Sequence, residues 1–332
     1  MGELLERRRR ETDVRLQHLH SELEEAAKLA DRRACVYATG SFARGEASTN
    51  SDLDLFIVGR GTEDNRALPK LDEICLKADL IEATRKLKIP DFSGDGEYLR
   101  HYTIDELVGS LGSAHDDATN TFTARLLLLL ESRPLVGEGT YDFAIDTVLS
   151  AYWRDYADHR TAFMPAFLAN DVLRIWRTFC VNYEARTETD PPRQKAKRKL
   201  KNFKLKHSRL LTCYSALACL LAMSKQDGTV SPPAAKEMVR RSPTQRLEWL
   251  KSYPGSTSAG TQVDALLAKY ERFLEATDAS EDKLIEKFLD RPTSQRLFKE
   301  ASQFGDEMFA LLDTIGRDGG GGVNPFYRLL LV

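Results

Sequence analysis

Hydrophobic positions recur at helical spacing through most of the chain. In residues 3–31, leucines and alanines follow one another at three- and four-residue steps between charged residues, which predicts an amphipathic helix. Beyond residue 103 nearly all hydrophobic positions follow this helical spacing. It predicts helices at residues 103–111, 118–132, 143–155, 165–186, 195–223, 231–239, 262–276 and 293–316. The second half of the chain is therefore predicted to be all-helical.

Two short apolar runs interrupt the helical pattern near the N-terminus. Residues 34–39 (ACVYAT) and 53–58 (LDLFIV) are rich in strand-forming side chains, and each run is followed by a glycine. Helical spacing returns at residues 65–88. A brief apolar stretch at residues 89–92 contains a proline and is compatible with an edge strand. The first ninety or so residues thus predict the order helix, strand, turn, strand, helix, strand.

The length of 332 residues favours two domains. The sequence Gly137-Glu138-Gly139 follows a helix that is predicted to be buried, so we place the domain boundary there. The predicted domains are residues 1–138 and 139–332, with a flexible glycine-rich tail from about residue 316.

Charge and cysteine content narrow the function classes. Lys and Arg total 48 against 50 Asp and Glu, so the net charge of -2 gives no global attraction to a polyanion. Any nucleic-acid contact must come from a local basic patch. The five cysteines include no C-x-x-C pair, which argues against a disulfide framework or a zinc ribbon. No signal peptide or membrane-spanning run is visible, so we expect a reducing cytoplasm and no membrane partner.

The chemically informative stretch is Gly40-Ser41-Phe42-Ala43-Arg44-Gly45, followed by Asp52-Leu53-Asp54 at the head of the second strand. Carboxylates at positions i and i+2 of a strand point to the same face, where they repel each other unless a cation lies between them. A hard divalent ion such as Mg²⁺ suits such ligands. A Gly-Ser turn before a short helix offers backbone N–H groups and a hydroxyl to a triphosphate. Either motif alone is common on solvated surfaces, but together they predict a phosphate site facing a metal-binding strand.

The segment GSFARGEASTNSDLDLFIV resembles the catalytic segment of the DNA polymerase β nucleotidyltransferase superfamily. It is most similar to the bacterial branch that includes minimal nucleotidyltransferases and protein-modifying uridylyltransferases. Residues 102–138 are loosely similar to the helical region that follows the catalytic sheet in the uridylyltransferase-like group. The resemblance implies an α+β fold, in which a small mixed β-sheet flanked by helices precedes an all-α helical domain.

The resemblance also implies roles for individual residues. It places Gly40, Ser41 and Arg44 at the nucleotide, and Asp52 and Asp54 on two Mg²⁺ or Mn²⁺ ions. The implied reaction moves a nucleoside monophosphate from an NTP to an acceptor hydroxyl and releases pyrophosphate (EC 2.7.7 type). The motif does not distinguish ATP from the other NTPs. The helical domain would complete the nucleotide and acceptor sites.

The family uses a third carboxylate on a neighbouring strand. Asp91 follows the predicted helix at the point where the third strand should begin, and we prefer it to Asp95 and Glu97. The competing interpretation of Asp91 is a turn or capping carboxylate before Gly94.

A basic run at residues 193–209 contains nine Lys or Arg and no acid. It could be a solvated helix face balanced by acids elsewhere. It could instead bind the triphosphate through Lys204, Lys206 or Arg209, or follow an RNA backbone through residues 195–201. The basic run and the size of the helical domain favour a macromolecular acceptor, either RNA or protein.

Two further patterns stay open. On the predicted helix at 170–184, Asp171, Arg174 and Arg177 form a polar stripe that could be an intrahelical ion-pair series or could line a cleft. Arg154 and His159 form an R-x4-H pattern similar to that of HEPN ribonucleases. The alternative function is therefore a HEPN-like ribonuclease or a catalytically silent partner in a toxin-antitoxin or defence pair.

Overall fold

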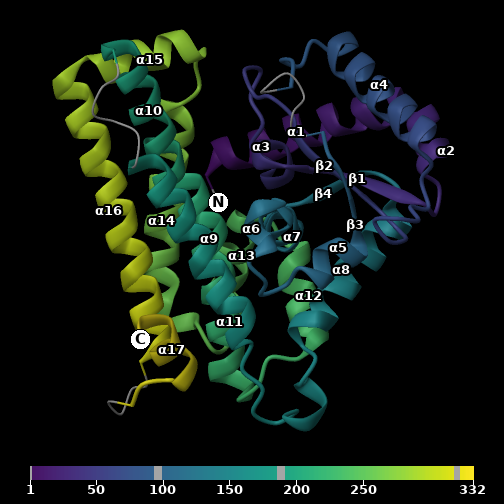
Figure 1. Ribbon diagram of the computed structural model, residues 1–332. Coiled ribbons are helices and arrows are strands. Elements are labelled where there is room, and N and C mark those ends of the chain that lie inside the picture. The colour runs from purple at the N-terminus through teal and green to yellow at the C-terminus, as the bar shows by residue number, and fades with distance from the viewer. Residues whose placement is uncertain (1, 93–98, 185–190, 318–321) are drawn as a thin grey trace. The chain divides into compact units, whose positions relative to one another are not determined.

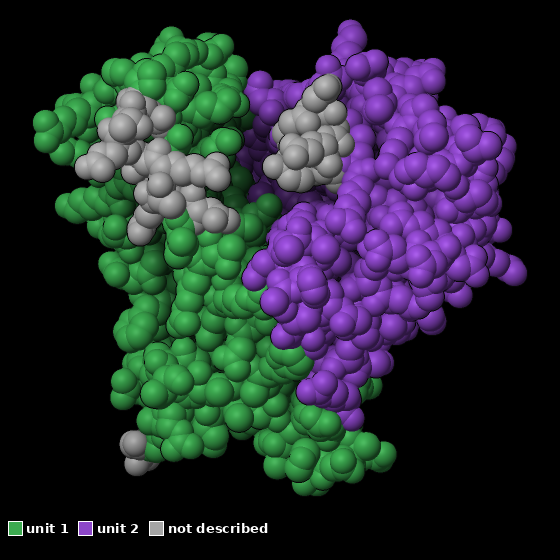
Figure 2. All heavy atoms as spheres, in the orientation of Figure 1, with its two compact units in different colours: residues 1–2, 155–332 green, residues 3–154 purple. Residues whose placement is uncertain are grey.

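The computed structural model describes residues 2–92, 99–184, 191–317 and 322–332. Its internal contacts divide the chain into two compact units, residues 3–154 and residues 1–2 with 155–332, which Figure 2 shows in purple and green. The division follows Arg154, whereas the glycines suggested a boundary at residue 138. The helix α8 (Glu138–Tyr152) accounts for the difference, because it packs against the sheet and against other helices of the first unit.

The first unit is built on one four-stranded sheet. Its strands are β1 (Ala34–Thr39), β2 (Asp54–Gly59), β3 (His101–Thr103) and β4 (Arg133–Val136), in the spatial order β3-β2-β1-β4. β1 is antiparallel to both of its neighbours, and β3 runs parallel to β2. The sheet is therefore mixed, and the predicted α+β fold is confirmed.

Helices cover both faces of this sheet (Figure 1). One face packs on α1 (Glu3–Glu22), α2 (Glu24–Ala30) and α4 (Lys70–Lys86) through a core that includes Val36 and Ile57. The predicted single helix over residues 3–31 is thus two helices that meet near Leu23. On the other face, the rings of Tyr37 and Phe56 stack, and the Tyr37 hydroxyl donates to the Ala124 carbonyl oxygen of α7 (Thr121–Leu130).

The third strand is not where the apolar pattern placed it. The stretch at residues 89–92 forms no strand, and Ile89 is instead a core side chain beneath α4. Lys88, with φ of 53°, turns the chain after the helix, and Pro90 has no N–H to give to a strand ladder. β3 follows at His101–Thr103, and the capping box between Thr103 and Glu106 then starts α5 (Ile104–Gly109).

Every named element of the second unit is a helix in its described residues, in agreement with the helical spacing of the sequence. Its helices are α9 (Ala166–Glu184), α10 (Pro192–Lys204), α11 (Leu210–Asp227), α12 (Pro232–Arg240), α13 (Pro243–Ser252), α14 (Gly260–Ala276), α15 (Glu281–Leu289), α16 (Arg291–Gly316) and α17 (Pro325–Leu331). None of the helices in the described residues is both long and apolar enough to span a membrane.

The C-terminal segment forms a helix where the glycine content suggested a flexible tail. The Asn324 side chain accepts a hydrogen bond from the Phe326 N–H, and Pro325 occupies the first helical position, so α17 has a well-formed start. Phe326 and Tyr327 are buried, which attaches the helix to its unit. The glycine run at residues 318–321 lies outside the described residues.

A π-helical turn (Leu205–Arg209) joins α10 to α11 and carries a buried histidine. The His207 ring stacks on Phe273 at 4.5 Å between centroids and meets Phe203 edge-on at 4.6 Å. His207 Nδ1 lies 2.9 Å from the Phe203 carbonyl oxygen. Because a carbonyl oxygen only accepts, Nδ1 must carry the proton and donate it. Burial among these rings favours the neutral imidazole over the imidazolium.

Acid should destabilise this unit through His207. Burial lowers its pKa to about 4, although the Phe203 carbonyl opposes the change. Because the folded-state pKa lies below the ordinary histidine pKa of 6.5, protonation favours the unfolded chain, and stability is lost as the pH falls from 6.5 to 4. We expect the free energy of unfolding to drop by about 3 kcal/mol over this range from His207 alone. Urea denaturation at each pH measures it. His207→Phe should remove this loss while exposed His18→Gln retains it, and equal pH dependence in both variants would contradict the assignment.

Candidate active site

The turn between β1 and β2 brings the two sequence motifs together. β1 ends at Thr39, and the one-turn helix α3 (Gly40–Arg44) begins at the next residue. In the antiparallel register Thr39 pairs with Asp54, the first residue of β2. Gly40 has φ of 66°, and a Cβ atom on it would lie 2.8 Å from Asp54 Oδ2. Only glycine fits this position, so the backbone of the turn lies directly against the Asp54 carboxylate.

Asp52 and Asp54 are both exposed, whereas Leu53 and Leu55 are buried in the core. The alternation turns the leucines toward the core and the two carboxylates away from it. The burial of the two leucines thus fixes the backbone that presents the acids. Asp54 thus lies beside the Gly-Ser turn, and Asp52 precedes β2 by two residues.

A buried hydroxyl adjoins the same position. Thr39 is 1% exposed, and within the described part of the chain its Oγ1 has no hydrogen-bond partner. Buried polar atoms are almost always paired in folded proteins, so an orphaned hydroxyl beside the turn suits a water or ligand atom bound there.

The donor chemistry fits a divalent cation that shares its coordination with a substrate. Asp52 and Asp54 offer carboxylate oxygens, the ligands that Mg²⁺ and Mn²⁺ prefer. Among the described residues there is no group of three or more His, Cys, Asp or Glu that could hold a metal ion. Mg²⁺ is commonly held by one or two carboxylates together with substrate phosphates, which such a site permits.

Asp91 does not join these carboxylates in any three-ligand group within the described residues. It is exposed, and its Oδ1 accepts from Arg85 Nε at 3.4 Å. These are the contacts of an exposed turn carboxylate, the competing interpretation of the sequence. Asp95 and Glu97 lie outside the described residues, so the identity of the third carboxylate stays a prediction.

The predicted nucleotide residue Arg44 points inward. Its guanidinium is buried and pairs with two carboxylates, Glu46 Oε2 at 2.8 Å from Nε and Glu131 Oε2 at 3.0 Å from Nη1. Glu131 Oε1 also accepts from the Gly40 N–H at 3.2 Å. Glu131 belongs to no motif of the sequence. Its only signal is a carboxylate placed directly after five leucines, where a buried helix ends.

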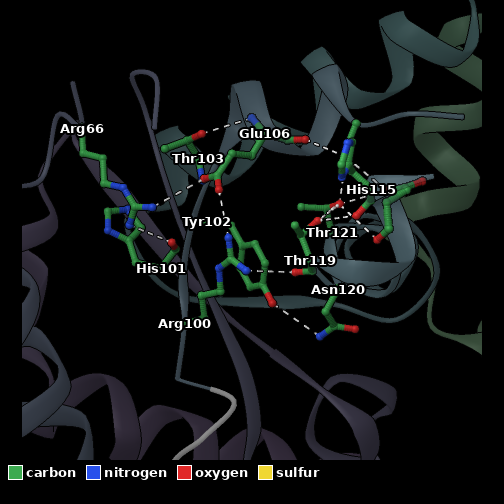
Figure 3. A network of polar contacts seen from close by, with 12 residues as sticks. Arg66, Arg100, His101, Tyr102, Thr103, Glu106, His115, Thr119, Asn120 and Thr121 are labelled. Carbon is green, nitrogen blue, oxygen red and sulfur yellow. Dashed lines mark hydrogen bonds and ion pairs between the residues drawn. The ribbon is translucent and has the colours of Figure 1, made fainter. Parts of the chain in front are cut away.

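A second polar network fixes β3 beside β2 (Figure 3). Arg100 donates to Glu106 Oε1 and to the Thr119 carbonyl oxygen, both at 3.2 Å, and its guanidinium lies over the Tyr102 ring. Arg66 donates to the His101 carbonyl oxygen at 2.9 Å. These contacts attach the neighbouring strand to the loop before α4 and to α5. Apart from the Thr103–Glu106 capping box, the sequence shows no signal for them.

The basic run lies in the second unit, and acids balance part of it. Arg193 pairs with Asp282, and Lys197 pairs with Glu281 at 2.6 Å, both at the start of α15. Four further lysines of α10 are exposed, namely Lys195, Lys199, Lys201 and Lys204. Lys204 ends α10, whereas Lys206 and Arg209 belong to the π-helical turn, where the Arg209 guanidinium lies 5.4 Å from the Phe179 ring.

The polar stripe of α9 and the R-x4-H pattern are the two other features that the sequence left open. Arg174 Nη1 lies 3.8 Å from Asp171 Oδ1, an intrahelical ion pair. Arg174 and Arg177 also line a cavity of about 400 Å³ between α9 and α17. The R-x4-H pattern is not on a helix, because α8 ends at Tyr152 and only a short 3₁₀ turn lies between Arg154 and His159.

Comparison with known proteins identifies the first part of the chain. Residues 20–105 match the family described as nucleotidyltransferase domain, of the DNA polymerase β type. The match includes Gly40, Ser41, Asp52 and Asp54, and it ends before Glu131 and the helical unit. No curated protein and no solved structure matches the chain. Residues 20–105 are therefore a nucleotidyltransferase domain, as the motif predicted.

Proposed function

Because residues 20–105 form a nucleotidyltransferase domain, we propose that the protein transfers a nucleoside monophosphate from an NTP to an acceptor hydroxyl. The transfer forms a bond from the acceptor oxygen to the α-phosphorus and breaks the bond to the departing pyrophosphate. One observation carries the proposal: the Gly40 backbone lies against Asp54, with no room for a Cβ between them. A triphosphate at the turn would then lie beside the metal-binding carboxylates.

Divalent ions, when bound, supply positive charge at the attacking and leaving oxygens of the displacement. Asp52 and Asp54 would hold them. Gly40 lets the backbone of the turn lie against Asp54, and the Ser41 side chain offers a hydroxyl at the start of α3. The buried Thr39 hydroxyl, which has no hydrogen-bond partner among the described residues, would accept or donate a bond to a water or ligand atom beside Asp54.

A screen with labelled nucleotides tests the activity. The protein is incubated with each labelled NTP, Mg²⁺ or Mn²⁺, and a cell extract, and the labelled products are then treated with ribonuclease or protease. Label on a macromolecule with one NTP, together with pyrophosphate release, is the expected result. If no NTP yields a labelled product with either metal and extracts from several sources, the proposal is wrong.

For the acceptor we favour RNA, with a protein as the other outcome. Lys195, Lys199 and Lys201 are exposed cations on one helix, which suits a phosphate backbone. Changing all three to Gln should flatten the plot of log affinity for single-stranded RNA against log salt by a slope of about 2, since each phosphate contact contributes roughly 0.7. Fluorescence anisotropy across a salt series measures the slope.

The matched control changes three other lysines of the same unit, Lys251, Lys287 and Lys299, to Gln. It removes the same total charge from different helices, so the slope should stay near that of the wild type. Equal slopes in the two triple variants, or RNA binding that does not change with salt, would contradict the RNA interpretation and favour a protein acceptor.

A further inference from the structure

Three buried charged side chains surround the turn that follows β1. The side chains of Glu131, Glu46 and Arg44 are 0%, 2% and 8% exposed. Burying charges is costly, and an apolar replacement of similar size is often at least as stable. Stability alone therefore does not account for ionic groups at this position, which suggests that their geometry matters.

Glu131 spans both ends of α3 with one carboxylate. Its Oε1 accepts from the N–H of Gly40, the first residue of the helix, at 3.2 Å. Its Oε2 accepts from Nη1 of Arg44, the last residue, at 3.0 Å. Arg44 Nε then donates to Glu46 Oε2 at 2.8 Å, beyond the helix. The whole turn is thus attached to the end of α7, where Glu131 is the C-cap residue.

Because of these contacts, we do not assign Arg44 as a direct nucleotide ligand. Its guanidinium is buried and oriented by two carboxylates, each of which accepts one of its N–H groups. In this arrangement the Gly40 N–H also donates to a carboxylate. Hydrogen bonds from other residues of the protein therefore fix the position of the turn.

We propose that Glu131, acting with Arg44, is a positioning residue that sets the distance between the triphosphate turn and Asp54. This inference rests on the proposed nucleotidyl transfer. Because a Cβ at Gly40 would lie only 2.8 Å from Asp54 Oδ2, the turn and the carboxylate are already as close as a glycine allows. Misplacement of reacting groups by about 1 Å can cost 10²-fold in rate. The bonds from Glu131 prevent such a displacement.

Steady-state kinetics of Glu131 variants tests this role. Glu131→Ala removes both bonds and should lower kcat/KM for the NTP by about 10²-fold. Glu131→Gln keeps an acceptor for the Gly40 N–H and should recover about tenfold of that loss. Glu131→Gln combined with Arg44→Gln should cost less than the product of the two single losses, because the residues act as one unit. The matched control is Asp116→Asn, which weakens another buried ion pair of this unit, between Asp116 and Arg125.

Hydrogen exchange of the ligand-free protein provides a readout that needs no activity. In Glu131→Ala the amides of residues 40–44 should exchange at least about tenfold faster than in the wild type, whereas in Asp116→Asn they should not. Exchange that is equal in all three proteins, or a kcat/KM loss in Glu131→Ala no larger than that in Asp116→Asn, would overturn the inference. A wild type without any transfer activity but with the expected exchange pattern would instead contradict the proposed function.

Discussion

Asp54→Asn should abolish nucleotidyl transfer and leave the fold intact. The exchange keeps the size of the side chain beside Gly40 but removes the negative charge that a divalent cation requires. Because the ions would stabilise both the attacking and the leaving oxygen, we expect the rate to fall by about 10³-fold or more. Asp54 is exposed at the first residue of its strand, so the melting temperature should change little. Transfer of label from the preferred NTP, together with a thermal melt, measures both quantities.

Two variants complete this experiment. Asp52→Asn should show a comparable loss, since both carboxylates are exposed and flank the buried Leu53. Asp64→Asn changes an exposed carboxylate in the loop after β2 and should keep the wild-type rate. If Asp54→Asn and Asp64→Asn label the acceptor equally, the carboxylates are not metal ligands and the assignment of the site is wrong.

The local part of this site could be predicted from the sequence because its components are close along the chain. Gly40 directly follows β1, and Asp54 begins β2. Because these two strands are adjacent and antiparallel, the connection between them is enough to bring the two residues together. The two strands themselves have six residues each and are mostly apolar, which is long enough to give a clear pattern.

The distant part could not be predicted in the same way. Glu131 lies 91 residues after Gly40, and it reaches the turn only because β4 returns to pair with β1. β3 contains three residues, His101 to Thr103, with no apolar run to mark it, and Ile89 nearby gave a stronger but misleading signal. The predicted role of Arg44 depended on a motif, and burial beside two acids is a tertiary property that a motif does not contain.

The second large effect, on the stability of the fold, is expected at the buried polar network around Arg125 of α7. Asp116 and Arg125 form a bidentate ion pair, with Oδ2 to Nη2 at 2.5 Å and Oδ1 to Nη1 at 2.9 Å, and both side chains are fully buried. Arg125 also donates to the Leu107 carbonyl oxygen at 2.8 Å and to the Tyr152 hydroxyl at 3.0 Å. Burial by itself lowers the pKa of Arg125, but its hydrogen bonds to Asp116 and Tyr152 outweigh burial and raise it. Arg125 is thus a permanent charge that joins α5, α6 (His115–Ala118), α7 and α8.

Asp116→Ala should therefore lower the free energy of unfolding by about 3–5 kcal/mol, because it leaves the Arg125 charge buried without its partner. Chemical denaturation of the full chain measures the change. Combining Asp116→Ala with Arg125→Met removes the unpaired charge. The double variant should recover most of the lost stability, to within about 2 kcal/mol of the wild type. The neighbouring exposed Asp117→Ala should cost less than about 0.5 kcal/mol.

The order of stability of these variants shows whether the cost comes from an uncompensated charge or from a simple loss of contacts. If contacts alone mattered, the double variant would be less stable than Asp116→Ala, since it lacks more of them; if the charge dominates, it is more stable. A double variant less stable than Asp116→Ala, or a cost for Asp116→Ala below about 1 kcal/mol, would contradict the prediction. Because Asp116→Ala lowers the free energy of unfolding of the unit, we expect transfer to fail at a lower temperature than in Asp117→Ala.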